Sequence, residues 1–192
     1  MVTKLPRTWI AILFYGALAL IAALWAWVSG TPSLWWGPAH LPWAAVPRLL
    51  LSIGLGGALA AFTVLLTRFT GRHTAWGRRL HREFQALVGD FTDREILIFA
   101  VASAFGEELL FRGAVQPDVG LLGTSILFGL IHIPSRGMLI WPLWAALMGL
   151  ALGSLYQLTG WIVGPILAHG LINYINLRHL RDKTPSNERA AP

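Results

Sequence analysis

The stretch Phe105-Gly-Glu-Glu-Leu-Leu-Phe-Arg-Gly113 decides the fold of this chain, because it places charge inside an apolar segment. That segment runs from about residue 96 to residue 115 and carries Glu107, Glu108 and Arg112. An ionisable side chain at the centre of a membrane helix costs about 2.5–3.5 kcal/mol on insertion scales, so such residues indicate function. Glu108 and Arg112 are four residues apart, share a helix face and can form an ion pair. Glu107 lies about 100° away around the helix and is left without a partner of its own.

An unpaired carboxylate in an apolar segment predicts a chemical role. A carboxylate removed from water binds a proton more readily than it does in solution, which suits general-base work near neutral pH. The alternative is a buried ion pair that only holds helices together, with Glu107 hydrogen-bonded to a neighbour.

The composition of the whole chain is that of an integral membrane protein. Of its 192 residues, 55% are hydrophobic and 12% are charged, whereas soluble domains carry about 25% charged residues. The net charge of +6 comes from Lys and Arg between apolar segments, where they set orientation and contact anionic lipid rather than nucleic acid. The sequence contains no Cys, which excludes disulfides, thiolate metal sites and a cysteine nucleophile.

Apolar runs predict an all-α fold, a polytopic bundle of about six transmembrane helices, because each span needs about 20 residues. The third span is capped by Thr92 or Asp93 and stops before Pro117. The fourth covers only about 15 Å, so either it starts earlier or it is a partial span. The six expected spans are residues 9–28, 48–66, 93–116, 124–133, 138–158 and 161–177.

Two segments between these spans have features of their own. Residues 29–47 form a connection rich in Pro, Gly and Trp, which breaks helix and suits the membrane interface. The Arg-rich segment 68–90 predicts an amphipathic helix on a membrane surface, with a solvated loop as the alternative. The apolar residues at helical spacing in it are Trp76, Leu80, Phe84 and Leu87.

The organisation predicted is one transmembrane domain, residues 1–178, with a motif core at about 91–177 and a disordered cytoplasmic tail at 179–192. Basic residues before the first span, in 68–94, at Arg136 and after the sixth span all fall on one side of six spans. The positive-inside rule then places both termini in the cytoplasm, and we expect a prokaryotic inner (plasma) membrane.

Two further polar motifs lie in apolar surroundings, Phe128-Gly-Leu-Ile-His132 and His169-Gly-Leu-Ile-Asn173. A lone histidine on an apolar face is usually a satisfied core residue. Two histidines, an Asn and a Glu pair on different helices instead predict one shared site, because bundles build sites from facing helices. Helix rise places Glu107 about 21 Å beyond Asp93, so we expect the site nearer the face opposite the basic segments.

A carboxylate with two histidines can activate water to hydrolyse a peptide bond. Glu107 would take the proton while His132 orients the water. His169 and Asn173 would donate hydrogen bonds to the oxyanion, which are worth about 2.7–4 kcal/mol per donor. Two histidines and a carboxylate are also a sound zinc set with an open water position, and the residues alone leave this alternative open.

The three motifs Glu107-Glu108-x-x-x-Arg112, Phe128-x-x-x-His132 and His169-x-x-x-Asn173 resemble, in order, those of a known family. This is the CAAX-protease and bacteriocin-processing (CPBP, or Abi) family of intramembrane proteases, which includes the type II CAAX prenyl endopeptidases. The resemblance covers about residues 91–177 and implies the same roles for these side chains. The family has been described both as glutamic proteases and as metalloproteases. We prefer the glutamic version, which requires no cofactor, because His169 and Asn173 are spaced to act together; zinc belongs to the alternative.

The resemblance also implies the partners, which are a membrane-anchored protein or peptide substrate and membrane lipid, without nucleic acid. CAAX enzymes trim prenylated C-termini at the cytoplasmic leaflet. Compact prokaryotic members include myxosortase-like sorting enzymes, which process the C-terminal membrane helix of exported proteins and fit an outward site better. The alternative outside the enzymes is a non-catalytic membrane scaffold or bacteriocin immunity protein.

Overall fold

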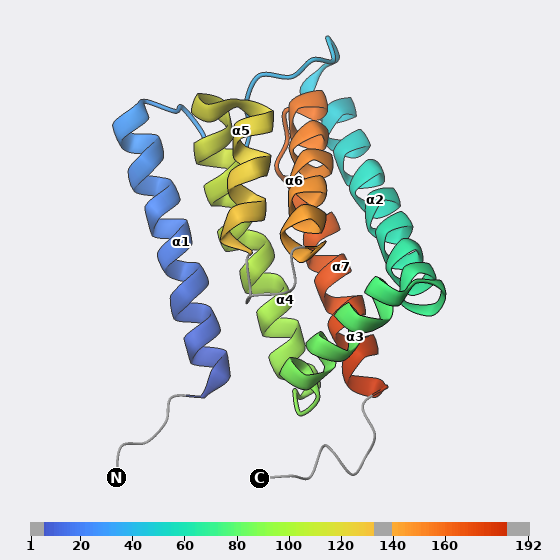
Figure 1. The fold of residues 1–192 in the computed structure, drawn as a ribbon. Coiled ribbons are helices and arrows are strands. Elements are labelled where there is room, and N and C mark those ends of the chain that lie inside the picture. Colours follow the sequence, from blue (N-terminus) through green and yellow to red (C-terminus); the bar gives the residue numbers. More distant parts are fainter. Residues whose placement is uncertain (1–5, 133–139, 184–192) are drawn as a thin grey trace, which may run out of the picture.

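The computed structural model describes residues 6–132 and 140–183, so Arg136 and the part of the predicted tail from 184 onward lie outside the described residues. The described chain forms a helical bundle without a named strand, and the all-α prediction is confirmed (Figure 1). Its elements are α1 (Arg7–Ser29), α2 (Ala45–His73), α3 (Ala75–Val88), α4 (Asp93–Glu108), the π-helical η1 (Leu109–Val115), α5 (Gln116–Ile131), α6 (Ile140–Thr159) and α7 (Val163–Asp182).

Within residues 6–132 and 140–183, three segments are long and apolar enough to cross a membrane, judged by length and composition: Arg7–Ser29, Ala45–His73 and Asp93–Ile131. The last is not one straight helix, because Gly120 has a φ of 80° and a ψ of 168° and reverses the chain. The part of α5 after Gly120 returns only partway into the bundle before α6 runs back (Figure 1). The short fourth segment is therefore a partial span, one of the two alternatives that its length left open.

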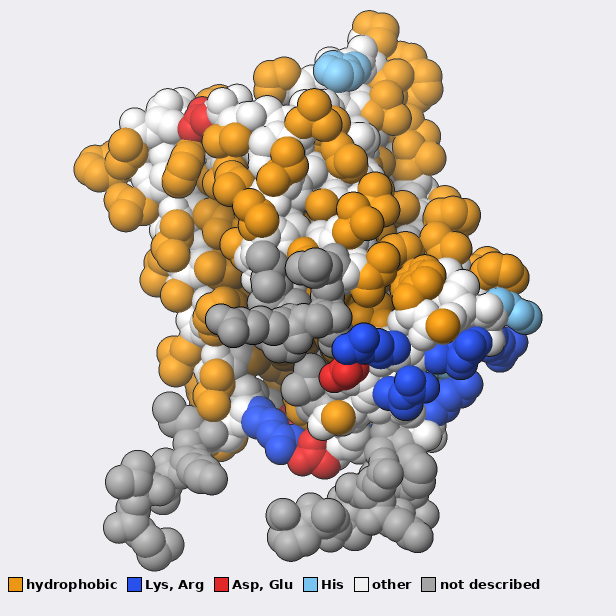
Figure 2. Space-filling view, viewed as in Figure 1, with side chains coloured by type: hydrophobic (Ala, Val, Ile, Leu, Met, Phe, Trp, Pro, Cys, Tyr) orange, Lys and Arg blue, Asp and Glu red, His pale blue; other side chains and the backbone are white. Residues whose placement is uncertain are grey.

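Two ends of the bundle can be distinguished. At the basic end lie the start of α1, the helix α3 and the end of α7; at the far end lie the connection 30–44 and the turns at Gly120 and Gly160 (Figure 1). Basic side chains gather at the basic end while apolar side chains cover the flanks (Figure 2). The amphipathic helix predicted within 68–90 is present as α3. Helix α7 continues to Asp182, so the first four residues of the predicted tail are helical.

The helix that carries the Glu pair departs from the prediction at its C-terminal end. Thr92 caps α4 in a capping box with Glu95, but the helix does not stop before Pro117. It widens into η1, where the N–H of Gln116 bonds to the carbonyl of Phe111, five residues back. In a regular α-helix the Pro117 ring would clash with the carbonyl of Gly113. The wider π-helical turn, a feature frequent at functional sites, accommodates Pro117 and lets the helix run on to Gly120.

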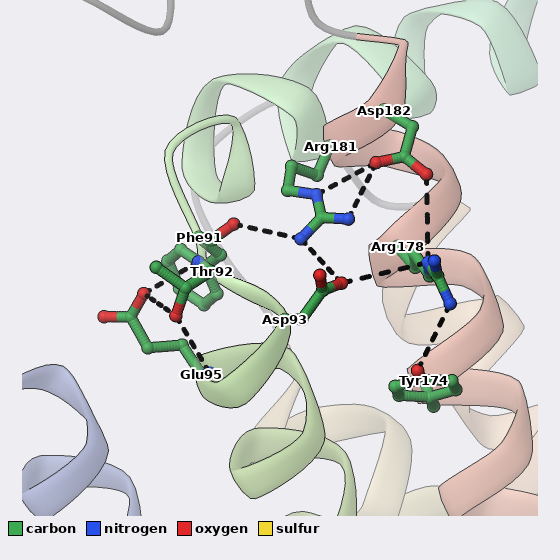
Figure 3. A network of polar contacts seen from close by, with 8 residues as sticks. All are labelled: Phe91, Thr92, Asp93, Glu95, Tyr174, Arg178, Arg181 and Asp182. Carbon is green, nitrogen blue, oxygen red and sulfur yellow. Dashed lines mark hydrogen bonds and ion pairs between the residues drawn. The ribbon is translucent and has the colours of Figure 1, made fainter.

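At the basic end, a charged network joins the start of α4 to the end of α7 (Figure 3). Arg181 lies 2.9 Å from Asp93 and 2.8 Å from Asp182, and its Nη1 also donates to the carbonyl of Phe91 at 3.5 Å. Exposed pairs of this kind contribute little to stability, at most about 1 kcal/mol each. Their effect is to align α4 with α7, the two helices that carry Glu107 and His169.

At the far end, the bundle is closed by backbone-to-backbone packing. Gly56 of α2 contacts Gly164 of α7 so closely that a Cβ built on Gly56 would lie 2.5 Å from the carbonyl oxygen of Gly164. The connection 30–44 pairs with the α6–α7 turn through bonds such as Gly37 N–H to the carbonyl of Gly160, 3.0 Å. Small residues allow this approach between membrane helices.

We expect Gly56→Ala to lower the stability of the protein, because the added methyl meets backbone that cannot rotate away. Overpacking of this kind costs about 1–3 kcal/mol. The matched control is Gly57→Ala, where an added Cβ meets nothing within 4 Å and where Ala is the better helix former. Thermal unfolding in detergent measures both, and equal melting temperatures for the two variants would contradict the close contact.

Candidate active site

The predicted ion pair is present and completely buried. Arg112 Nη1 donates to Glu108 Oε1 at 3.0 Å, and the exposed fractions of the two side chains are 1% and 0%. Arg112 Nη2 also donates to the carbonyl of Gly149 on α6 at 3.2 Å, and its guanidinium lies 4.7 Å from the centre of the Phe128 ring. Arg112 thus joins α5 and α6 to the helix that carries both glutamates.

Glu107 points away from this pair, as the helix geometry predicts, and faces two histidines. Its Oε2 lies 3.8 Å from His132 Nε2 and 3.9 Å from His169 Nε2. Both distances are too long for direct hydrogen bonds and suit a bridging water. Oε2 is buried and has no hydrogen-bond partner among the described residues, so one carboxylate oxygen is directed at the space between two imidazoles.

Each histidine ring is held in place by a hydrogen bond of Nδ1, the ring nitrogen that does not face Glu107. His132 Nδ1 lies 2.6 Å from the carbonyl oxygen of Phe128, which can only accept, so Nδ1 carries the proton. His169 Nδ1 donates to Glu108 Oε1 at 2.7 Å. Glu108 therefore accepts from both Arg112 and His169, and the ion pair also fixes the ring that faces Glu107.

Asn173 lies one helical turn beyond His169 and lines the same cavity. Its amide Nδ2 donates to Ser103 Oγ at 3.0 Å, while Ser103 Oγ donates in turn to the carbonyl of Ala100 at 3.2 Å. The structure therefore brings all six predicted side chains to one region, five in mutual contact and Asn173 beside them.

Two residues of this region were not predicted as part of the site. Ser103 lies four residues before Glu107, and that spacing is the signal that could have placed it beside the site. Tyr15 of α1 lines the cavity and its hydroxyl interacts electrostatically with Glu107. It is a polar aromatic residue in the middle of an apolar span, and nothing in its spacing links it to the other motifs.

Ser103→Ala tests how Asn173 is held. Removing the hydroxyl frees the Asn173 amide to rotate. For the peptide hydrolysis that the motifs predict, we expect turnover to fall three- to tenfold with little change in KM, which corresponds to one neutral hydrogen bond of about 0.5–1.5 kcal/mol. Ser103→Thr keeps the hydroxyl and should restore most of the rate. The matched control is Ser125→Ala, a buried serine whose hydroxyl donates to the carbonyl of Leu121; an equal loss of turnover in this control would contradict the positioning role.

The site opens into a cavity of about 470 Å³ that extends from Glu107, His132 and His169 to the basic end of the bundle. One wall is formed by α7 and the residue that follows it, and it alternates polar or basic side chains with apolar ones: His169, Ile172, Asn173, Asn176, Leu177, His179, Leu180 and Lys183. The opposite wall is apolar and aromatic, with residues of α3, α5 and α6: Trp76, Leu80, Phe84, Phe128, Trp141, Trp144 and Met148.

The cavity runs from the site to the basic end, whereas we expected a site nearer the face opposite the basic segments. The depth of Glu107 along its helix was the reason for that expectation, yet depth does not determine which end is open. The close Gly56–Gly164 contact and the connection 30–44 close the far end. Arg68 and Arg72 of α2 line the cavity at the basic end together with α3 and the end of α7.

The spacing of these side chains is wider than that of a zinc site. No group of three or more His, Cys, Asp or Glu side chains in residues 6–132 and 140–183 is arranged to hold a metal ion. Tetrahedral zinc ligands at about 2.0–2.1 Å from the ion lie about 3.3 Å from one another. The separations of 3.8 and 3.9 Å from Glu107 Oε2 to the two imidazoles exceed this by about half an ångström. Glu107, His132 and His169 would be the ligands if a small movement brought them together.

Comparison with known proteins confirms the family resemblance. Residues 94–175 match the family model described as type II CAAX prenyl endopeptidase Rce1-like. The uncharacterized protein YpbD of Bacillus subtilis (strain 168) is 30% identical over 109 residues, which cover 50% of this chain and 57% of that protein. The chain thus spans little more than half the length of this curated relative. No solved structure gives a significant match. With its three apolar candidate spans, the chain is an integral membrane protein.

Proposed function

We propose that this chain, in which residues 94–175 match the Rce1-like type II CAAX prenyl endopeptidases, is an intramembrane endopeptidase of the glutamic type. The observation that supports this most strongly is the position of Glu107. A buried carboxylate oxygen with no hydrogen-bond partner among the described residues faces two imidazole Nε2 atoms at 3.8 and 3.9 Å inside a cavity. This is the geometry in which a water molecule can be bound and deprotonated.

In the proposed reaction, Glu107 accepts a proton from water and His132 Nε2 orients that water. His132 Nδ1 carries its proton towards Phe128, so Nε2 is free to accept a hydrogen bond. The hydroxide attacks the peptide carbonyl carbon, and the proton on Glu107 passes to the leaving amine as the C–N bond breaks.

His169 and Asn173 stabilise the negative oxygen of the tetrahedral intermediate. His169 Nδ1 already donates to Glu108, so its Nε2 can donate only if the ring is doubly protonated. An imidazolium at this position makes the net charge of the cluster zero, because the two carboxylates Glu107 and Glu108 then face the two cations His169 and Arg112. Asn173 donates through its second amide hydrogen, since the first is bonded to Ser103.

The place of the site supports one class of substrate. A cavity reached from the basic end, with an aromatic wall, fits a membrane-anchored protein or peptide cleaved near its point of anchorage, in C-terminal processing of such proteins. We infer that the basic end faces the cytoplasm of a prokaryotic inner membrane. Asp118 lies at the far end, so the Asp118→Cys variant should react with an impermeant thiol reagent added outside intact cells; reaction only after lysis would contradict this orientation.

The glutamic mechanism is tested by metal removal. The purified chain, reconstituted in vesicles with a membrane fraction from cells that lack it, should cleave discrete bonds that mass spectrometry detects as new peptide termini. Cleavage should survive strong chelation, because no step needs a metal. Stoichiometric zinc by elemental analysis, lost with activity on chelation and restored with it on zinc addition, would replace the glutamic mechanism by the zinc-dependent one.

A further inference from the structure

Five basic side chains from three helices meet at the opening of the cavity at the basic end. They are Arg68 and Arg72 of α2, His81 of α3, and His179 and Lys183 at the end of α7, and we refer to them as the cationic mouth. The His81 and His179 rings are in edge-to-face contact, with centroids 5.8 Å apart. Glu107, at the opposite end, is the only acidic residue among the described residues that line this cavity.

The cationic mouth concentrates positive charge, and no acidic side chain in the described part of the chain lines the cavity beside it. The pKa of His179 is lowered to about 4, first by burial and then by the basic side chains of Arg68, Lys183, His81 and Arg72. All four side chains therefore lie close enough to His179 to disfavour a positive charge on its ring. Arg68 Nε is buried and has no hydrogen-bond partner among the described residues. Like charges held together in a partly desolvated place are unfavourable unless an anion joins them.

The surroundings of the cationic mouth are those of a membrane surface. Arg72 lies at the end of the candidate span Ala45–His73, and the amphipathic α3 crosses the bundle beside it (Figure 1). Exposed Arg side chains of the same helix continue the basic surface seen in Figure 2. Anionic headgroups are the anions found at this level of a membrane.

The aromatic wall of the cavity indicates that the anionic group belongs to a molecule with a long apolar chain. Trp76, Phe84, Trp141 and Trp144 lead from the cationic mouth towards the catalytic side chains. Ten residues of α7 separate His179 from His169, which is about 15 Å of helix and equals the hydrocarbon depth of one leaflet. An acyl chain whose headgroup lies at the mouth would therefore reach the level of Glu107.

We infer that the cationic mouth binds the anionic headgroup of a lipid whose hydrocarbon chain lies along the aromatic wall of the cavity. The ligand class is an amphiphile with a phosphate or carboxylate head, from either a phospholipid or a free fatty acid. Because the hydrocarbon chain of the lipid fills the route to Glu107, bound lipid and substrate compete for the same space. The binding itself does not depend on proteolytic activity.

The test uses the full chain in detergent and native mass spectrometry with dioleoyl phosphatidylglycerol, dioleoyl phosphatidylcholine and oleate. The wild type should retain phosphatidylglycerol or oleate and bind phosphatidylcholine far more weakly; the tighter of the two anionic ligands identifies the source. Each basic residue near an anionic lipid contributes about fivefold in binding, so Arg68→Gln with Arg72→Gln should weaken retention about 20- to 30-fold. Lys183→Gln alone should weaken it about fivefold.

The matched control is Arg79→Gln with Arg82→Gln, which removes two exposed charges from α3 that do not line the cavity. This control should bind the anionic lipid as the wild type does, and unchanged melting temperatures would show that all variants are folded. Equal weakening in both double variants would reduce the effect to general surface charge and overturn the site. Equal retention of phosphatidylcholine, or tight binding of a soluble acidic peptide with the same dependence on Arg68 and Arg72, would also overturn the inference.

Discussion

Glu107→Gln should remove cleavage while leaving the protein folded. The amide keeps the shape of the side chain but cannot accept the proton of water, and general-base catalysis contributes about 10²–10⁴-fold. Stability should be unchanged or slightly higher, because the variant replaces a carboxylate that is 7% exposed and has one buried oxygen without a partner among the described residues. A rate assay on the reconstituted chain and thermal unfolding in detergent measure the two effects.

The matched control for this variant is Glu83→Gln on the exposed face of α3, which removes one negative charge that does not line the cavity. It should cleave at the wild-type rate. Near wild-type cleavage by Glu107→Gln would end the glutamate hypothesis. A large loss of stability in Glu107→Gln would show instead that this carboxylate holds the helices together, the alternative that the sequence left open.

Arg112→Ala should lower both stability and activity, because it leaves Glu108 buried with His169 as its remaining ionic partner. Breaking a buried pair costs roughly 3–5 kcal/mol. The loss is enlarged here because Arg112 also bonds to the carbonyl of Gly149 and packs on Phe128. The free energy of unfolding in denaturant and the cleavage rate measure both effects, and a stable, fully active Arg112→Ala protein would contradict the role of the pair.

A double variant separates structure from chemistry at this pair. Glu108→Gln combined with Arg112→Met removes both charges, so no lone ion remains buried and much of the stability should return relative to Arg112→Ala. Activity should stay low, because the amide oxygen can still accept from His169 Nδ1 but no longer carries the negative charge that lies 2.7 Å from that nitrogen and favours a doubly protonated ring. Recovery of both properties together would show that the charge of Glu108 is not needed by His169.

The site was predictable because its chemistry lies in short helical motifs. Glu108 and Arg112 at i and i+4 had to share a face, and the same geometry turned Glu107 away from them. The partner of His169 was not predictable, because Glu108 lies 61 residues away in the sequence and spacing within one helix says nothing about contacts between helices. The role of Ser103 beside Asn173 was missed for the same reason.

The fold was predicted where apolar periodicity is strong and missed where backbone geometry decides. The spans at α1 and α2 and the capping box at Thr92 follow from local sequence. The π-helical turn before Pro117 does not follow from local sequence, because a proline in an apolar run predicts the end of a helix. The opening of the cavity at the basic end did not follow from the depth of Glu107 along its helix, because it depends on which helix ends separate in space. Glycine contacts and aromatic packing determine that separation together.

The most direct test of the proposed activity is a comparison of membrane-protein termini in cells that produce the wild-type chain or Glu107→Gln at equal levels. Mass spectrometry of enriched peptide termini should find a small set of membrane-anchored proteins with new termini near their anchors in wild-type cells only. These termini should be absent from cells with Glu107→Gln, while the uncut proteins accumulate. Identical termini in the two kinds of cell would contradict an intramembrane protease built around Glu107.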